Sequence, residues 1–151
     1  MCVHYFYIGV FMVNKYMDCA IKEAIKAKEI NNVPVGAVIV RDGKIVSKGY
    51  NKKNSDNISL LHAELIAIYK ACKKLNKWIL DDCDMYVTMK PCKMCYYALA
   101  ETRIRNVYYI MNSNYYYNLE KNGNKIKFIE CDDNYGYYSI VNNFFQEIRN
   151  K

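Results

Sequence analysis

Pro91-Cys92-Lys93-Met94-Cys95, read together with His62-Ala63-Glu64, is the part of this 151-residue sequence that decides its fold. Cys92 and Cys95 are spaced so that, on a helix, both sulfurs lie on one face about one turn apart. Thiolate and imidazole groups bind zinc well, so His62 and the two cysteines supply three ligands. Structural zinc sites are usually closed by four protein ligands, whereas catalytic sites keep one position for water. The pattern therefore favours a hydrolytic zinc site.

Glu64 is the candidate general acid and base of this site. In the middle of a helix, its side chain and that of His62 would diverge by about 200°. In a first turn, with His62 near the cap, both side chains can approach one cavity. Zinc lowers the pKa of a bound water to about 7, and Glu64 would carry the proton that this water loses. The sequence therefore predicts a proton carrier beside the metal.

Each half of the pattern also has a simpler interpretation. A lone Cys-x-x-Cys is typical of a redox pair or of half a structural zinc site, and a lone His62 of a capping or surface histidine. Cys92 falls at a predicted helix start, where the helix dipole favours a thiolate, and Pro91 suits the first turn of that helix. The two halves together, each at the start of a helix, favour the catalytic interpretation.

Hydrophobic periodicity places both motifs among alternating helices and strands. Asp42-Gly43 predicts a tight hairpin turn between two strands, because such turns need positive φ. Strands that alternate with helices indicate an α/β domain of three layers. The predicted helices are 15–29, 62–74, 93–102 and 138–149, and the predicted strands are 35–40, 44–50, 84–89, 107–111 and 125–131.

Composition indicates a soluble globular domain, with 52% hydrophobic and 25% charged residues. The net charge of +7 fits a polyanionic partner such as RNA, and it equally fits a coding bias towards Lys. The 7 cysteines form an odd set without a regular framework, which predicts a reducing, cytoplasmic location. Cys92 and Cys95 alone have ligand spacing.

The first thirteen residues are apolar and differ from the rest of the chain. They are shorter than the roughly 20 apolar residues that a membrane span needs, and they lack the basic start of a signal peptide. We expect residues 1–13 to be an extension or alternative-start segment, and 14–151 to be a single domain. A membrane anchor or a packing strand is the other interpretation of this segment. No other segment is predicted to cross a membrane.

These motifs resemble the zinc-dependent cytidine and deoxycytidylate deaminase superfamily, whose pattern is H-x-E followed by P-C-x-x-C. Within it, the resemblance is closest to the bacterial tRNA-specific adenosine deaminases, and it covers residues 15 to 149. The stretches that carry it besides the two motifs are 33–40, Gly49-Tyr50-Asn51, Tyr86-Val87-Thr88, Thr102-Arg103-Ile104 and Asn143-Phe144-Phe145.

The resemblance implies a cytidine deaminase-like α-β-α fold whose central mixed sheet has about five strands. It implies one Zn²⁺ per subunit on His62, Cys92 and Cys95, with Glu64 as the catalytic residue. It also implies substrate contacts from Asn51, Ala63 and Pro91. The implied partners are the anticodon loop of tRNA, whose wobble adenosine would become inosine, and a second subunit in a homodimer. A turn-forming role after a strand is the other interpretation of Asn51.

The sequence departs from the tRNA branch at three places. Lys90 precedes Pro91 where the branch usually carries Glu, Tyr96-Tyr97 replaces small residues, and 108–113 lacks a Gly-rich acidic loop start. Deamination of free guanine, cytosine or deoxycytidylate is therefore the alternative function. A third interpretation is a non-catalytic zinc module that binds RNA, although the retained Glu64 argues against it. The Tyr-rich loop after residue 111 and the basic tail suit base stacking and phosphate contacts, or a solvated surface.

Overall fold

The computed structural model describes residues 3–113 and 126–151, with side chains from residue 15 onward. The Tyr-rich loop that the sequence links to RNA lies mostly outside these residues. The described elements, in chain order, are α1 (Val3–Glu29), β1 (Gly36–Arg41), β2 (Lys44–Tyr50), α2 (Ala63–Leu75), β3 (Cys83–Met89), α3 (Lys93–Glu101), β4 (Asn106–Met111), β5 (Lys127–Glu130) and α4 (Tyr137–Arg149).

The described strands form one mixed sheet in the order β2-β1-β3-β4-β5. β1 pairs antiparallel with β2 and β3, whereas β3 and β5 both pair parallel with β4. The predicted hairpin turn is present, because Asp42 and Gly43 have φ of 49° and 73°. The mixed five-stranded sheet expected from the resemblance is confirmed.

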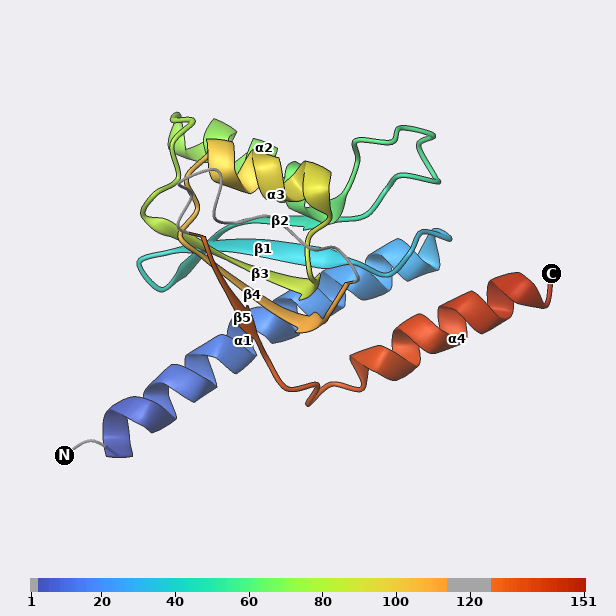
Figure 1. Cartoon of the computed structure of the whole chain (residues 1–151), viewed down its shortest axis with the longest axis horizontal. Coiled ribbons are helices and arrows are strands. Elements are labelled where there is room, and N and C mark those ends of the chain that lie inside the picture. The colour runs from blue at the N-terminus through green and yellow to red at the C-terminus, as the bar shows by residue number, and fades with distance from the viewer. Residues whose placement is uncertain (1–2, 114–125) are drawn as a thin grey trace.

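Helices cover both faces of the sheet and produce three layers (Figure 1). α2 and α3 lie on one face, where their apolar side chains pack on Ile39, Met85 and Val87. α1 and α4 pack on the other face, against Val38 and Tyr86 among others. Successive residues of β1 and β3 therefore point into different cores, as expected for a sheet buried on both sides. The predicted α-β-α architecture is confirmed.

Two glycines let helices approach the sheet closely. A Cβ on Gly36 would overlap the backbone oxygen of Ala20 in α1, and one on Gly49 would overlap that of Ala63 in α2. Gly49 therefore supports the first turn of α2, which directly follows His62. Any side chain larger than hydrogen at this position must push that turn away from the strand.

Two predictions of helix starts are wrong, and the last strand, β5, is shorter at both ends than the predicted 125–131. α1 begins at Val3 rather than at residue 15, because nothing in the apolar segment before residue 15 interrupts the helical backbone. Pro91 lies outside α3 rather than in its first turn, because Cys92 is the extended N-cap, with ψ of 174°. None of the helices in the described part of the chain combines the length and apolar character that a membrane span requires.

Candidate active site

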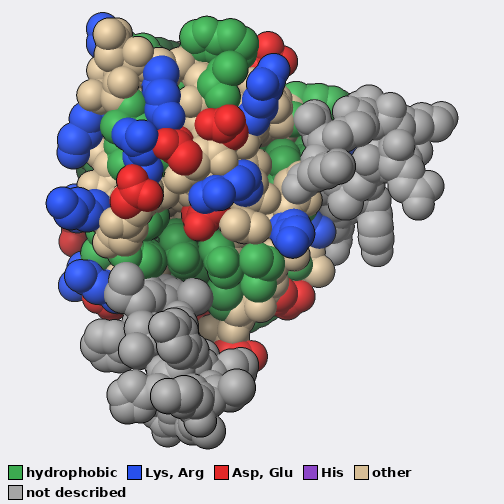
Figure 2. All heavy atoms as spheres, turned by 90° about the vertical axis from the view of Figure 1, so that its left-hand side faces the viewer, with side chains coloured by type: hydrophobic (Ala, Val, Ile, Leu, Met, Phe, Trp, Pro, Cys, Tyr) green, Lys and Arg blue, Asp and Glu red, His purple; other side chains and the backbone are tan. Residues whose placement is uncertain are grey.

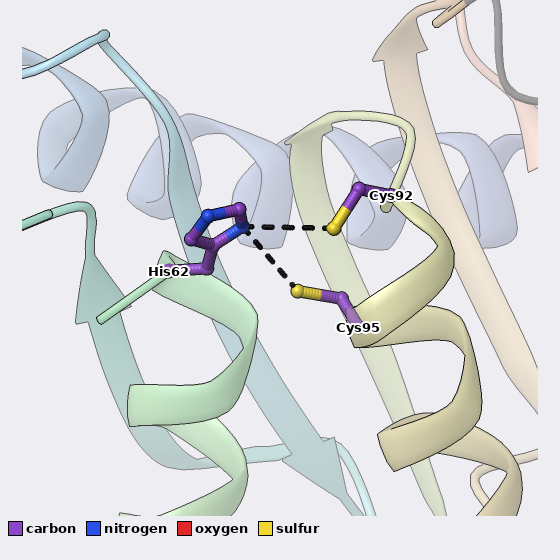
Figure 3. Close-up of side chains that lie close together, drawn as sticks. All are labelled: His62, Cys92 and Cys95. Carbon is purple, nitrogen blue, oxygen red and sulfur yellow. Dashed lines mark hydrogen bonds between the residues drawn. The ribbon is translucent and has the colours of Figure 1, made fainter. Parts of the chain in front are cut away.

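The predicted zinc ligands meet where α2 and α3 begin (Figure 3). His62 is the N-cap of α2 and Cys92 is the N-cap of α3, while Cys95 lies in the first turn of α3. Nδ1 of His62 lies 3.7 Å from Sγ of Cys92 and 3.6 Å from Sγ of Cys95. Two helix starts thus bring three donor atoms to one point, as the sequence predicts.

The spacing of these donors fits a tetrahedral zinc ion. Bonds of about 2.3 Å to sulfur and about 2.0 Å to nitrogen place each N···S pair about 3.6 Å apart at a tetrahedral angle. The donor atoms of His62, Cys92 and Cys95 all lie within 4.8 Å of one another. The chemistry of the set agrees as well, because zinc combines imidazole and thiolate ligands readily. Three protein donors leave the fourth position for a small molecule.

Hydrogen bonds within the triad shift the pKa values of its two cysteines in opposite directions. The pKa of Cys92 falls to about 4, because its sulfur accepts hydrogen bonds from Cys95 and from His62. The same contact with Cys92, together with burial, raises the pKa of the Cys95 thiol. The contact with Cys92 also raises the pKa of His62. Metal ligation requires thiolates and a neutral imidazole, so zinc uptake here must release protons.

Glu64 is buried beside the triad, with 4% of its side chain exposed. Burial raises the pKa of its carboxyl to about 7, and this effect outweighs the opposing influences of a backbone N–H and of His62. Glu64 is the second residue of α2. Both it and His62 therefore line the same pocket, as first-turn positions predict. A carboxyl of this pKa can accept and return a proton near neutral pH.

The pocket beside the triad has a volume of about 200 Å³. Pockets for drug-sized ligands have volumes of roughly 300–1,000 Å³, so this smaller space suits one planar base rather than a complete nucleotide. Of the predicted substrate contacts, Asn51 and Ala63 line the pocket, whereas Pro91 is buried and is not among its lining residues. The lining residues that the sequence analysis did not name as contacts are Val33, Val35, Lys53, Met89, Lys90 and Ser113.

Asn51 supports the loop as well as lining the pocket. Its Nδ2 donates to the carbonyl of Val33 at 3.2 Å, and its Oδ1 accepts from the N–H of Lys53 at 3.0 Å. Both polar ends of the side chain are therefore engaged with backbone, which favours the turn-forming interpretation. A substrate contact by Asn51 stays a prediction.

Two lysines line the pocket near the triad. Lys53 lies close enough to His62 for its charge to oppose protonation of the imidazole. Nζ of Lys90 lies 5.6 Å from the ring centre of Tyr109 and 5.8 Å from that of Phe128. Lys53 could have been found from the sequence, because its polar loop ends directly before the metal motif. The position of Lys90 depends on tertiary contacts with two other strands.

The bulky pair Tyr96-Tyr97 divides between core and surface. Tyr96 is 2% exposed and lies 6.0 Å from Phe128 between ring centres, whereas Tyr97 is 57% exposed. The core therefore accommodates the first ring, and the second stands on the surface of α3. Neither tyrosine lines the pocket beside the triad.

Comparison with known proteins supports the same site. The model of the cytidine and deoxycytidylate deaminase zinc-binding region matches residues 12–111, which include all three donors and Glu64. The chain belongs to this family. A curated relative, the tRNA-specific adenosine deaminase of Aquifex aeolicus (strain VF5), is 45% identical over 92 residues. That match covers 61% of this chain and 61% of the relative, so the chain spans about three fifths of that relative's length.

Two solved structures resemble the chain over most of its length. One comes from studies of A-to-I editing by tRNA:A34 deaminases at the wobble position of transfer RNA. It has a TM-score of 0.72 at 30% identity and covers 78% of this chain and 98% of its own. The other is guanine deaminase from Bacillus subtilis, with a TM-score of 0.63 at 29% identity, which covers 91% of this chain and 94% of its own. These two structures are named for different substrates, transfer RNA and guanine.

Proposed function

We propose that this chain is a zinc-dependent hydrolytic deaminase that converts adenosine to inosine at the wobble position of the tRNA anticodon. One observation carries the proposal: His62 and Cys92 of the metal triad, the buried Glu64 and two lysines line a single pocket sized for one base, and the third donor, Cys95, lies beside them. The triad and Glu64 account for hydrolysis, and the lysines account for a substrate with phosphates. The relative from Aquifex aeolicus and the structural neighbour named for tRNA:A34 deaminases support the same substrate.

The reaction exchanges one bond for another at C6 of adenine. When bound to His62, Cys92 and Cys95, zinc supplies Lewis acidity that lowers the pKa of a coordinated water. Glu64 takes a proton from the attacking water and delivers it to the adjacent ring nitrogen as the C6–O bond forms. Glu64 then passes the second proton of that water to the amino group, so the C6–N bond breaks and ammonia leaves. Water and adenosine thus give inosine and ammonia.

The small pocket requires the target base to leave the anticodon stack. Base-modifying enzymes take up a flipped nucleotide and read the base within the pocket. The ribose and its flanking phosphates would then remain at the mouth of the pocket. There the ammonium groups of Lys53 and Lys90 can bind the phosphates. On the face shown in Figure 2, Lys and Arg side chains are interspersed with Asp and Glu, so that face is not uniformly basic. We assign RNA binding to the surface around the pocket, because Lys53 and Lys90 line it.

Deamination of a free base or nucleotide (guanine, cytosine or deoxycytidylate) is the second candidate. The resemblance to guanine deaminase from Bacillus subtilis favours it, because that structure matches nearly the whole chain. A neutral free base would make no use of the two lysines that line the pocket. A non-catalytic zinc module is the third candidate, and the burial of Glu64 beside the triad argues against it.

The proposal includes a homodimer in the cytoplasm. A groove beside α2 exposes Leu60 and Tyr69, which are 57% and 66% exposed. Lys52, Lys70 and Asp56 border the same groove, so it carries both signs of charge. In a dimer with two-fold symmetry, the same surface of both subunits forms the interface. Lysines of one groove can then lie opposite the aspartate of the other. We therefore assign a second copy of this chain as the occupant of the groove.

Light scattering tests the dimer. The molar mass of the wild-type protein should be twice the mass of the chain, and that of Tyr69→Glu should equal the mass of one chain.

A product assay decides among the three candidates. The zinc-loaded protein is incubated in parallel with an anticodon stem-loop carrying a wobble adenosine, with guanine, with cytosine and with deoxycytidylate. We expect inosine in the stem-loop and no ammonia from the other three substrates. Ammonia released from guanine, cytosine or deoxycytidylate, with the stem-loop unchanged, would exclude the tRNA proposal. If the protein holds one zinc per chain and turns over none of the four substrates, the result would favour the non-catalytic module.

A further inference from the structure

A chain of buried hydrogen bonds runs behind the pocket, beyond the residues that face the substrate. Tyr137, the first residue of α4, is 0% exposed. Its hydroxyl donates to the carbonyl of Pro34 at 2.7 Å and accepts from Oγ1 of Thr88 at 3.0 Å. Oγ1 of Thr88, also fully buried, accepts from the N–H of Gly36 at 3.2 Å. The start of α4 is thereby joined to Pro34, which lies 103 positions earlier in the sequence, and through Thr88 to β3 and β1.

Asn51 also bonds the short segment Val33-Pro34-Val35, which contains the carbonyl that Tyr137 bonds. The backbone N–H of Asn51 donates to the carbonyl of Val35 at 3.0 Å, and its Nδ2 donates to that of Val33. Together with the bond from Tyr137 to Pro34, three successive carbonyls are each fixed by a donor. Val33 and Val35 are the side chains that this segment presents to the pocket.

Thr88 connects the hydrogen-bond chain to a second wall of the pocket. Its neighbour Met89 lines the pocket, and β3 leads from there through Lys90 to the zinc-binding cysteines. The network therefore touches the base-facing wall on two sides without including a metal ligand or Glu64. Burial raises the pKa of Tyr137 well above its usual range, so the hydroxyl keeps the proton that it donates.

We infer that Tyr137 is a positioning residue for the substrate base, acting through Pro34 and Thr88 on the wall formed by Val33, Val35 and Met89. This inference rests on the proposed deaminase function and adds a determinant of base binding that lies outside the pocket. A buried carbonyl and a buried hydroxyl lose a partner when the phenol oxygen is removed, and the segment must shift to regain one. The aromatic ring alone would still fill the core.

The test compares two neighbouring tyrosines of α4. Tyr137→Phe removes the hydroxyl of the network, while Tyr138→Phe is the matched control, because its hydroxyl bonds the carbonyl of Ile110 at 3.4 Å and its side chain is 43% exposed. For Tyr137→Phe we expect KM for the stem-loop to rise about five- to tenfold, with kcat within about twofold of wild type. Zinc content should stay unchanged. Tyr138→Phe should match wild type in both constants.

Thr88 provides an internal check on the network. Thr88→Val should raise KM in the same direction, and Thr88→Ser, which keeps the hydroxyl, should restore it. The double variant Tyr137→Phe/Thr88→Val should be less affected than the product of the single effects, because both changes break one chain. An unchanged KM in Tyr137→Phe overturns the inference. Parallel losses of zinc and kcat in that variant also overturn it, because they indicate a purely structural role.

Failure of the proposed function can be told apart from failure of this inference. A wild-type protein that leaves the stem-loop unchanged but deaminates a free base refutes the tRNA substrate alone. The variants are then compared on that free base, since the wall faces the base in either case. A wild-type protein that is active on any of the substrates, with an unaltered KM in Tyr137→Phe, refutes the positioning role alone.

Discussion

At the scale of single residues, the site depends on placing a carboxyl where burial keeps it ready to exchange a proton. Glu64→Ala should therefore keep one zinc per chain and lose deamination by at least about 10²–10⁴-fold, the usual contribution of general acid-base catalysis. Glu64→Gln, which keeps the side-chain volume, should lose activity equally. Zinc analysis and inosine release measure the two properties separately. Normal turnover in either variant would remove Glu64 from the mechanism.

Lys53 should distinguish a phosphate-bearing substrate from a free base. It lines the pocket, so Lys53→Ala should raise KM for the stem-loop and reduce the salt slope of RNA binding by about one. Lys127→Ala is the control, because Lys127 pairs with Asn106 at the start of β4, away from the pocket. Steady-state kinetics at several salt concentrations measure both quantities. Equal effects of the two substitutions would argue against a local phosphate contact.

At the scale of elements, the two strand glycines should have different consequences. Gly36→Ala and Gly49→Ala both force a helix away from its strand, and each should lower the free energy of unfolding by about 1–3 kcal/mol. Only Gly49 faces the first turn of α2, which positions His62 and Glu64. Gly49→Ala should therefore also weaken zinc binding, whereas Gly36→Ala should leave it intact. Urea unfolding and competition with a zinc chelator test this pair. Equal zinc affinity in both variants would refute the distinction.

Asp82 joins the end of β1 to the segment after α2 through a pH-dependent contact. It lies 2.6 Å from Arg41 and 2.8 Å from Lys77. The hydrogen bond from Lys77, with the charge of Arg41, lowers the pKa of Asp82 to about 2. A carboxyl whose pKa is lower in the folded state than in the unfolded state stabilises the fold at pH values above its unfolded pKa of about 3.9. This stabilisation is lost as the pH falls towards 2.

Asp82→Asn should accordingly lower the free energy of unfolding at pH 7 by less than about 1 kcal/mol, since the carboxyl is partly screened by solvent. The difference from wild type should shrink as pH falls from about 5 towards 2. Asp42→Asn is the matched control, because Asp42 is 3.9 Å from Arg41 and its side chain is 87% exposed. Urea unfolding across this pH range gives the comparison. A difference that is constant with pH would show that the charge of Asp82 is not its cause.

The elements also show what the sequence can and cannot predict. β2 has its predicted bounds, because Asp42-Gly43 starts it with a defined turn and a polar loop ends it. The convergence of His62 with Cys92 follows from helix starts, which local motifs mark. The bond from Tyr137 to Pro34 has no local pattern, since it joins residues far apart in the chain. Pro91 was misplaced because φ of proline suits both the first helical turn and the residue before the cap.

At the scale of the whole molecule, charge and shape give different information about the substrate. The net charge of +7 predicts attraction to RNA, but the face shown in Figure 2 mixes both signs. The lysines that line the pocket locate the expected contact more closely than composition can. We expect affinity for the stem-loop to fall steeply with salt, with a slope set by the few phosphates near the pocket rather than by total charge.

The zinc ligands come from two helices that are separate in sequence, so occupancy of the site is linked to the folding equilibrium. A ligand that binds only the native state at about 100 times its Kd adds about 2.7 kcal/mol to stability. Mutations anywhere in the two cores that cost less than this should therefore be masked when zinc is plentiful. They should emerge as unfolded protein when zinc is scarce. The zinc supply would then determine which destabilising substitutions the fold can tolerate. Removing zinc should unfold the variants whose stability depends on the bound metal.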